Sequence, residues 1–394
     1  MRVLILSHAQ YITIGLPKII EFAESLVELG HEVSLCVTSK DKRWGIVRHV
    51  KNGVQIIECP SLLFGGLRHG VDFFDALNRI WALKEEKFDI VHCVASRPTV
   101  FYPGIFLKKK NRVKVLIYEW EDSFAHGGVA LERRGKTYYR LFGGIEKYFE
   151  EAILKHADGV IVVSDFLAQR AMELGVVKQS ILHQIKGTKL IEQEFPEKEI
   201  ARRKLGYRNT DNEIVFTYVG AIYESDLSLL LASFDAIAKL YSRVKLILVG
   251  YNRKLPDHIP PNVTILPRVP DKQYHLQLAM TDVFVLPLDN SIANISRYPS
   301  KFGDYLAVGR PVVATPHPEI GRMIRCGKCG YVADNASVSS FSSALIKALD
   351  DQGRWPMFSE NARNYALRNL SWDSIGRRVV AYYESILTQK TQFS

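Results

Sequence analysis

Residues 296–315 read SRYPSKFGDYLAVGRPVVAT and predict a loop, a short helix and a buried strand, in that order. Pro299 suits the start of the helix and Gly309 its end, because proline has no N–H to lose in a first turn and glycine accepts a left-handed cap. Pro311 opens a run of β-branched residues that is typical of a strand. The same alternation of apolar runs and longer amphipathic segments continues on both sides of this stretch.

Two series of buried strands are expected from these apolar runs. The first comprises residues 2–7, 32–37, 54–58, 89–94, 113–118 and 159–164, and the second comprises 213–220, 244–250, 263–266, 282–287 and 311–315. Continuous apolar strands that alternate with helices indicate parallel sheets covered on both faces. The predicted fold class is therefore α/β, with two tandem Rossmann-like, doubly wound domains that face a cleft.

The domain boundaries follow from a change in composition. Residues 187–212 are charged, contain Gly and Pro and lack a long apolar run, so we expect them to link a first domain, 1–186, to a second, 213–371. A last predicted helix, about 372–394, could pack back on the first domain. Because ligands bind at the carboxyl ends of such strands, the active site is expected in a cleft between the domains.

The composition narrows the class of protein. Of 394 residues, 47% are hydrophobic and 24% are charged, as in ordinary globular proteins, which argues against a disordered or fibrous chain. The net charge of +10 favours anionic partners such as nucleotide phosphates, an acidic membrane or nucleic acid. No apolar run reaches the roughly 18 residues of a spanning helix. We expect a cytoplasmic protein, or one that is peripheral on the cytoplasmic face of the membrane.

The cysteines do not predict a metal site or a disulfide framework. There are five of them, an odd number, and only Cys326 and Cys329 are close in sequence. A structural zinc site needs about four ligands, and no second pair lies nearby. The segment CGKCG is therefore expected to be a tight turn, and no metal is expected.

The helix predicted after Pro299 has the features of an anion site. Its N-terminus offers N–H groups and a partial positive charge, and Arg297 and Lys301 flank it with full charges. Asp304, one turn further on, has the carboxylate that two ribose hydroxyls would need as an acceptor. The alternative interpretation is that Lys301 and Asp304 belong to an ordinary solvated helix face.

This stretch resembles the nucleotide-sugar motif of retaining glycosyltransferases with the GT-B fold, of the large family-four group. Pro299, Asp304, Ala307, Gly309 and PVVA (311–314) occupy the positions of that motif. Other segments resemble family strands and turns in the same order: GHEV (30–33), DIVH (89–92), ADGVIVVSDFL (157–167), TYVG (217–220), LILVG (246–250) and TDVFVLP (281–287).

The resemblance implies an activity and a set of donor contacts. The activity is transfer of a sugar from a nucleotide diphosphate sugar, of UDP or GDP type, to a hydroxyl of a lipid-linked or oligosaccharide acceptor, with retention and without a metal, as in polysaccharide biosynthesis. Asp304 would hold the ribose, and the N–H groups near Ser300 and Lys301 would hold the diphosphate. The backbone near Arg268 and Val269 would line the base pocket. Gly15 would approach the diphosphate from the first domain.

The chain departs from the family pattern at two places in the donor site. Ser296 stands where the family often has a carboxylate that handles sugar hydroxyls, so the sugar stays open. Residues 221–226, AIYESD, have no basic residue where the family usually has Arg and Lys. Neutralisation of the diphosphate is therefore expected to fall to Arg297 and Lys301.

A second candidate site follows the strand at 113–118, in the segment YEWEDSFAHGG (118–128). Glu121, Asp122 and His126 are the candidate catalytic residues, because a carboxylate there could deprotonate an acceptor hydroxyl. Clustered carboxylates also raise one another's pKa. They could bind a divalent cation, which the resemblance argues against. A lone histidine in a loop is more often a hydrogen-bonding residue than a catalyst.

The segment after the basic run RRGK (133–136) has an apolar stripe at helical spacing, which includes Leu141, Phe142, Ile145 and Tyr148. Such a stripe is usually core packing. With its basic start it could instead dock on anionic lipid, as could the similar segment 69–84. Two alternatives to a transferase also stay open, a nucleotide-sugar epimerase of the same fold and a degenerate protein that only binds nucleotide sugar. Nucleic-acid binding would explain the charge but not the motif.

Overall fold

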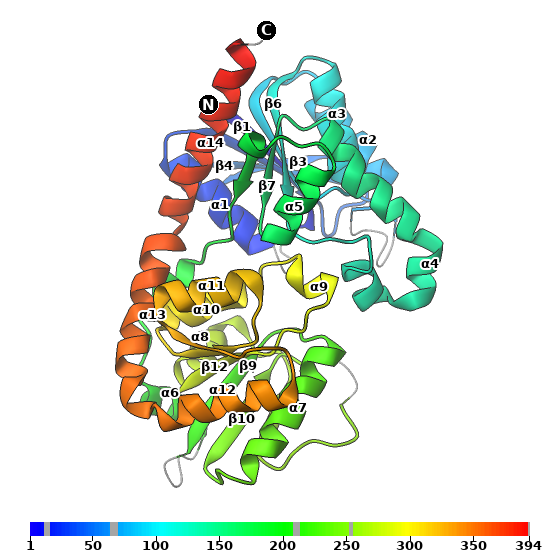
Figure 1. The fold of residues 1–394 in the computed structure, drawn as a ribbon. Coiled ribbons are helices and arrows are strands. Elements are labelled where there is room, and N and C mark those ends of the chain that lie inside the picture. The colour runs from blue at the N-terminus through cyan, green and yellow to red at the C-terminus, as the bar shows by residue number, and fades with distance from the viewer. Residues whose placement is uncertain (12–15, 64–69, 208–212, 252–254, 393–394) are drawn as a thin grey trace. The chain divides into compact units, whose positions relative to one another are not determined.

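The computed structural model describes residues 1–11, 16–63, 70–207, 213–251 and 255–392 (Figure 1). The chain forms two compact units. The first comprises Met1–Gly187, Ile295–Tyr298 and Trp372–Ser394, and the second comprises Thr188–Asn294 and Pro299–Ser371. The residues from 188 to 207, within the expected linker, contribute the short helices η4 (Lys189–Glu192) and α6 (Lys198–Lys204) to the second unit.

The first unit is built on an eight-stranded sheet in the order β3-β4-β2-β1-β5-β6-β7-β8. Its strands are β1 (Arg2–Gln10), β2 (Glu32–Thr38), β3 (Val47–Lys51), β4 (Val54–Cys59), β5 (Phe88–Val94), β6 (Val113–Trp120), β7 (Gly159–Val162) and β8 (Ile181–His183). All neighbours are parallel except β3 and β4, which are antiparallel. Val3, Leu4, Ile5 and Leu6 of β1 are fully buried, as expected for a central strand covered on both faces.

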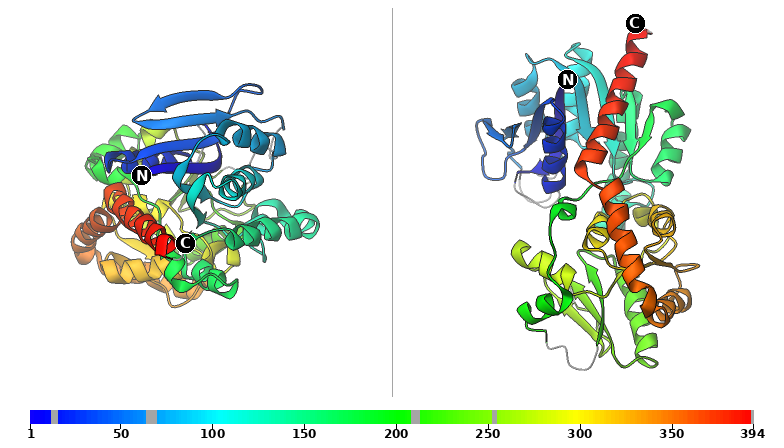
Figure 2. Two further views of the ribbon diagram at one scale, coloured as in Figure 1. Left: turned by 90° about the horizontal axis from the view of Figure 1, so that it is seen from above. Right: turned by 90° about the vertical axis from the view of Figure 1, so that its left-hand side faces the viewer.

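Helices cover this sheet: α1 (Leu16–Glu28), α2 (Phe73–Leu83), α3 (Pro98–Lys109), α4 (Val129–Ala152), α5 (Asp165–Glu173) and α14 (Trp372–Gln392). Two single turns, η2 (Ile153–Lys155) and η3 (Lys178–Ser180), complete the set within the described residues of this unit. The last helix, α14, packs beside α1, as Figure 2 shows. Phe22 and Leu26 of α1 share one core cluster with Trp372 and Val379 of α14.

The second unit has a six-stranded, all-parallel sheet in the order β11-β10-β9-β12-β13-β14. Its strands are β9 (Ile214–Val219), β10 (Val244–Val249), β11 (Val263–Leu266), β12 (Val283–Leu286), β13 (Val312–Ala314) and β14 (Gly330–Val332). The remaining helices are α7 (Glu224–Ala238), α8 (Asp271–Ala279), α10 (Lys301–Val308), α11 (Pro318–Gly327), α12 (Val338–Asp350), η5 (Gln352–Arg354) and α13 (Trp355–Asn369). The short α9 (Ile292–Ile295) precedes the return to the first unit.

The predicted fold class is confirmed, since both units are Rossmann-like α/β sheets of mainly parallel strands. In each sheet the order in which strands are added reverses beside a central strand. β1 lies between β2 and β5, and β9 lies between β10 and β12. The crevice at the carboxyl end of such a strand is where doubly wound sheets bind ligands. Ligand-binding residues are therefore expected at these two edges, each within its own unit.

The expectation that the stripe on α4 packs in the core is wrong. Leu141, Phe142, Ile145 and Tyr148 are between 44% and 68% exposed. Two carboxylates from the opposite face of the helix, Glu146 and Glu150, are buried instead. Both find partners inside: Glu146 forms an ion pair with Arg97, and Glu150 accepts hydrogen bonds from backbone amides. Satisfied carboxylates can be buried, so helical periodicity did not reveal which face of α4 points inward.

Candidate active site

Helix α10 of the second unit is held firmly against the sheet. The ring of Tyr305 stacks on that of Phe284 in β12, with centroids 3.9 Å apart and planes 2° from parallel. The Tyr305 hydroxyl accepts a hydrogen bond of 2.8 Å from the Val219 N–H at the end of β9. Gly309, with φ of +73°, caps the helix as the sequence predicts. The start of α10 is thereby fixed at the carboxyl edge of β9.

Lys301, the first residue of α10, places its ammonium at this edge. Its Nζ donates to the Tyr218 hydroxyl at 2.5 Å and to the Ala221 carbonyl at 2.9 Å, and lies 3.9 Å from the centre of the Tyr218 ring. Gly220, with φ of +97°, leaves room for it, because a Cβ there would lie 3.4 Å from the lysine Cε and Nζ. Ser300 precedes the helix as its exposed N-cap residue. The positive charge of Lys301 and the N-terminus of α10 thus lie together at the point where the strand order reverses.

Asp304 lies one turn further along α10, and its carboxylate is buried. It accepts a 2.7 Å hydrogen bond from the Thr188 hydroxyl and a 2.8 Å hydrogen bond from the Tyr274 hydroxyl. Burial and the Asp304 charge together raise the pKa of Tyr274 well above its usual range. A solvated helix face therefore does not describe Asp304. A ribose that hydrogen-bonds to this carboxylate would add to, or replace, the hydrogen bonds that Thr188 and Tyr274 already donate.

The other predicted donor residues belong to other parts of the chain than α10. Arg268 is exposed and Val269 half-buried, just beyond the carboxyl end of β11. Arg297 is half-buried and belongs to the first unit, where its charge acts on Asp122. Gly15 lies outside the described residues.

In the first unit, the carboxyl end of β6 carries a group of charged residues that are buried or half-buried. Lys186 Nζ lies 2.7 Å from Glu119 Oε1 and 3.0 Å from Glu121 Oε1. His92 joins the group from β5, with Nε2 at 3.0 Å from Glu119 Oε2 and Nδ1 at 2.5 Å from the Tyr383 hydroxyl. One ammonium therefore serves two carboxylates.

The two carboxylates titrate differently. Burial works to raise the pKa of Glu119, but the Lys186 charge and the His92 hydrogen bond lower it to about 2. Burial raises the pKa of Glu121 despite the attraction of Lys186. In turn, Glu119 and Glu121 hold the pKa of Lys186 above its usual range against the effect of burial. Glu119 is thus a fixed negative charge, and Glu121 is the better proton acceptor near neutral pH.

Asp122 and His126 have different surroundings. Burial raises the pKa of Asp122, although the charges of Arg133, Arg297 and Arg97 oppose the rise. The His126 ring places Nε2 3.0 Å from Glu151 Oε1 and 3.2 Å from a nitrogen of Arg170. His126 therefore joins an ion group between α4 and α5.

The loop after β6 is fastened by a residue that the sequence analysis did not single out as functional, Glu150 of α4. Its carboxylate accepts from the N–H groups of Phe124 and Ala125 at 3.0 and 2.8 Å, and from the Trp120 indole at 3.1 Å. Burial outweighs these hydrogen bonds and raises the pKa of Glu150 to about 7. Ser296 adds a second fastening, because its hydroxyl accepts from the Ser123 N–H at 3.2 Å.

Lys186 and His92 were also missed as site residues. Each stands at or near the carboxyl end of a strand, β8 and β5, where a charged or titratable residue is a signal in a parallel sheet. The pairing of Lys186 with Glu119 spans 67 positions in the sequence numbering, so no local pattern contains it.

Comparison with known proteins agrees with this geometry. The family model described as Glycosyltransferase Family 4 matches residues 19–183, and the one described as Glycosyl transferases group 1 matches residues 213–351. A sucrose-phosphate synthase structure from Thermosynechococcus elongatus superposes with a TM-score of 0.71 and 15% identity, over 99% of this chain and all (100%) of that one. The chain is a glycosyltransferase of the GT-B, family-four type.

Its relatives are distant. The uncharacterized glycosyltransferase MJ1069 of Methanocaldococcus jannaschii is 20% identical over 294 residues, 72% of this glycosyltransferase and 71% of the relative. The structure of HepE from Anabaena in complex with UDP-glucose has a TM-score of 0.68 and 13% identity, over 98% of this chain and 100% of that chain. Among the described residues, no helix combines the length and apolar character that crossing a membrane requires.

Proposed function

We propose that this glycosyltransferase moves a sugar from a UDP- or GDP-type nucleotide sugar to a hydroxyl of a lipid-linked or oligosaccharide acceptor, with retention and without a metal. The observation that carries the proposal is the Lys301 ammonium, held at the start of α10 at the carboxyl end of β9. Support comes from HepE, whose structure holds UDP-glucose. The glycosyltransferase families do not favour the epimerase alternative.

In this proposal the second unit holds the leaving group. Lys301 and the N–H groups near Ser300 neutralise the diphosphate, Asp304 takes the ribose, and the backbone near Arg268 and Val269 takes the base. Arg297 and Gly15 are the remaining residues proposed for the donor. Stabilising charge as it develops on the diphosphate is the main catalytic effect expected of such a site.

The first unit supplies the acceptor side. The acceptor oxygen bonds to the anomeric carbon on the face from which the diphosphate departs. As the carbon–diphosphate bond breaks, the acceptor proton passes to the diphosphate or to Glu121. Asp122 lies next in sequence and orients the acceptor. His126, bound to Glu151 and Arg170, holds the loop.

Thermal unfolding with a panel of UDP-, GDP- and ADP-sugars tests the donor site, because a ligand that binds only the folded protein raises the Tm. We expect one class to raise the Tm of the natural protein. Lys301→Met should weaken binding of that class by about 1.5–3 kcal/mol, the value of a hydrogen bond to a charged group. Lys239→Met, at the exposed C-cap residue of α7, is the matched control. If no nucleotide sugar stabilises the natural protein, the proposal is wrong.

A further inference from the structure

Helix α2 of the first unit exposes its large apolar side chains and buries its charged ones. Its apolar residues Phe73, Phe74, Leu77 and Trp81 are between 52% and 67% exposed. Its charged residues Asp75 and Arg79 are fully buried. An amphipathic helix on a soluble domain normally turns the apolar face inward. The reversal leaves large aromatic side chains outside.

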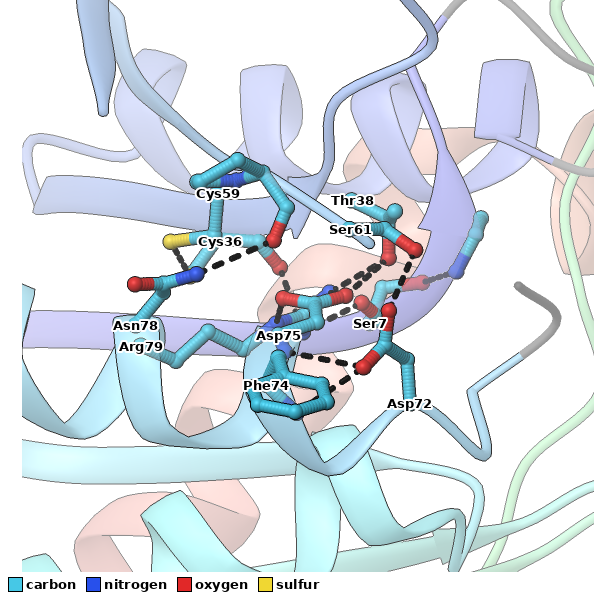
Figure 3. Close-up of polar contacts among 12 residues, drawn as sticks. Ser7, Cys36, Thr38, Cys59, Ser61, Asp72, Phe74, Asp75, Asn78 and Arg79 are labelled. Atoms are coloured by element: carbon cyan, nitrogen blue, oxygen red, sulfur yellow. Dashed lines mark hydrogen bonds and ion pairs between the residues drawn. The ribbon is translucent and has the colours of Figure 1, made fainter. Parts of the chain in front are cut away.

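A buried polar network explains why the charged face points inward (Figure 3). Arg79 Nε lies 2.8 Å from Asp75 Oδ1, and other guanidinium nitrogens donate to the Ser7 carbonyl at 2.7 Å and the Thr38 hydroxyl at 2.9 Å. Asp72 caps the helix by accepting from the Phe74 N–H at 2.8 Å. The network binds α2 to the ends of β1 and β2 by charge and hydrogen bonds, so its apolar residues are not needed for packing.

Ring contacts through α3 and through the half-buried Phe149 of α4 connect the outward apolar residues of α2 with those of α4. Tyr102 of α3 links them, with ring centroids 5.6 Å from Phe73 of α2 and 5.9 Å from Phe149 of α4. We call this surface the aromatic face. It comprises Phe73, Phe74, Leu77, Trp81, Tyr102, Leu141, Phe142, Ile145 and Tyr148, all of them exposed.

The charges around the aromatic face are of one sign along α4. Every exposed charged side chain of that helix is basic: Arg133, Arg134, Lys136, Arg140 and Lys147. Its acidic residues Glu146 and Glu150 are buried, and Glu132 and Glu151 are half-buried. Aromatic side chains beside lysine and arginine suit the interface of an anionic bilayer, where the rings enter the headgroup region and the cations meet lipid charges.

We propose that the aromatic face docks this protein on an anionic membrane surface. Helix α4, which carries part of the aromatic face, also contacts the loop of the candidate acceptor site. Glu150, on the opposite side of this helix, accepts from the amides of Phe124 and Ala125, which lie two and three positions after Asp122. Resting on the proposed function, the acceptor hydroxyl is then one carried by a molecule anchored in the same lipid surface.

Vesicle sedimentation with the full chain tests the docking. The natural protein should bind vesicles that contain phosphatidylglycerol and not vesicles of phosphatidylcholine alone. Two variants address the two features of the aromatic face: Leu77→Ser with Trp81→Ser for the apolar contact, and Arg140→Glu with Lys147→Glu for the charge. Each should lower the vesicle partition coefficient at least tenfold. All four side chains are exposed, so the fold should survive.

Matched controls come from the second unit, Leu240→Ser for the apolar change and Lys239→Glu for the charge, both at exposed positions. Unchanged binding by the controls supports the docking surface. Negligible binding of the natural protein, or binding that the variants retain, overturns it. So does a dimer that the variants abolish, or binding to duplex DNA in place of vesicles. A nucleotide sugar that still raises the Tm while vesicle binding fails would reject this surface and leave the proposed function standing.

Discussion

Lys186 decides how the two carboxylates after β6 behave, since its ammonium lies within 3.0 Å of both. Substituting a residue of similar size without charge should leave the buried Glu119 and the half-buried Glu121 without a compensating charge. Removing one partner of a buried ion pair costs about 3–5 kcal/mol. We expect Lys186→Met to lose free energy of unfolding of that size near neutral pH, measured by urea denaturation.

The pH dependence separates this charge effect from a loss of packing. In the natural protein the pKa of Glu119 is lowered to about 2, so its stabilisation is present above its ordinary pKa and is lost as the pH falls toward 2. In Lys186→Met the carboxylates should take up protons more readily, so the deficit should shrink from about pH 8 to about pH 4. A deficit that stays constant over this range would indicate packing alone, and Lys186→Arg should restore most of the stability.

Asp304 has a structural role as well as the proposed one, because it binds the hydroxyls of Thr188 and Tyr274. Asp304→Asn should weaken donor binding by about 1.5–3 kcal/mol, as expected for a hydrogen bond to a charged group. Calorimetric titration with the donor found by thermal screening measures this. Tyr274→Phe is the control, since it removes a partner of Asp304 and leaves the carboxylate. Equal donor affinity in Asp304→Asn and the natural protein would restrict Asp304 to structure.

At the residue scale, the position of α10 could be predicted, because Pro299 precedes the helix and Gly309 caps it. The donor-binding roles of Lys301 and Asp304 stay predictions. The hydroxyl partners of Asp304 could not be predicted, because Thr188 is 116 positions away in sequence. The carboxylates after β6 could likewise be recognised in the sequence as candidate site residues. Lys186, the cation that they share, could not.

At the scale of elements, α4 fixes the loop that follows β6 through the hydrogen bonds of Glu150 to the Phe124 and Ala125 amides. The pKa of Glu150 is raised to about 7, so folding favours its protonated form. Its contribution to stability is therefore full below its ordinary pKa and is lost as the pH rises through 7. A rise from the ordinary value of 4.5 to about 7 corresponds to roughly 3 kcal/mol.

Glu150→Gln should flatten this dependence, because the amide does not ionise. We expect the stability of the natural protein to fall more steeply than that of the variant between about pH 5 and about pH 8, followed by chemical denaturation. The variant also loses an acceptor for the Trp120 indole, which should lower its stability equally at all pH values. Parallel pH profiles for the two proteins would show that Glu150 does not titrate in this range.

The strands that were predicted are those with continuous apolar runs, and the missed strands lack such runs. β3 reads VRHVK and joins the sheet antiparallel at its edge, while β8 and β14 have three residues each. Helical periodicity found the stripes of α2 and α4 but not their direction. Which face of each helix points inward depends on the hydrogen bond between Arg79 and Thr38 and on the ion pair between Arg97 and Glu146. These contacts form only once the sheet has formed.

At the scale of the whole molecule, the chain passes between its two units four times. It leaves the first unit after Gly187, returns for Ile295–Tyr298, and returns finally at Trp372. The division into two α/β units follows from the two series of apolar runs. The brief return could not be predicted, because Ser296 is tied to Ser123 and Ser164 by hydrogen bonds between distant parts of the sequence.

The position of α14 limits how this enzyme can be assembled and re-engineered. Trp372 and Val379 fill the same core cluster as Phe22 and Leu26, although the whole second unit separates them along the chain. During synthesis, this core cluster cannot be completed until residues 372–386 have been added to the chain. Chimeras that exchange the second unit between related transferases must keep this helix with the first unit, because a single cut near residue 187 would remove Trp372 and Val379 from the core cluster of the first unit.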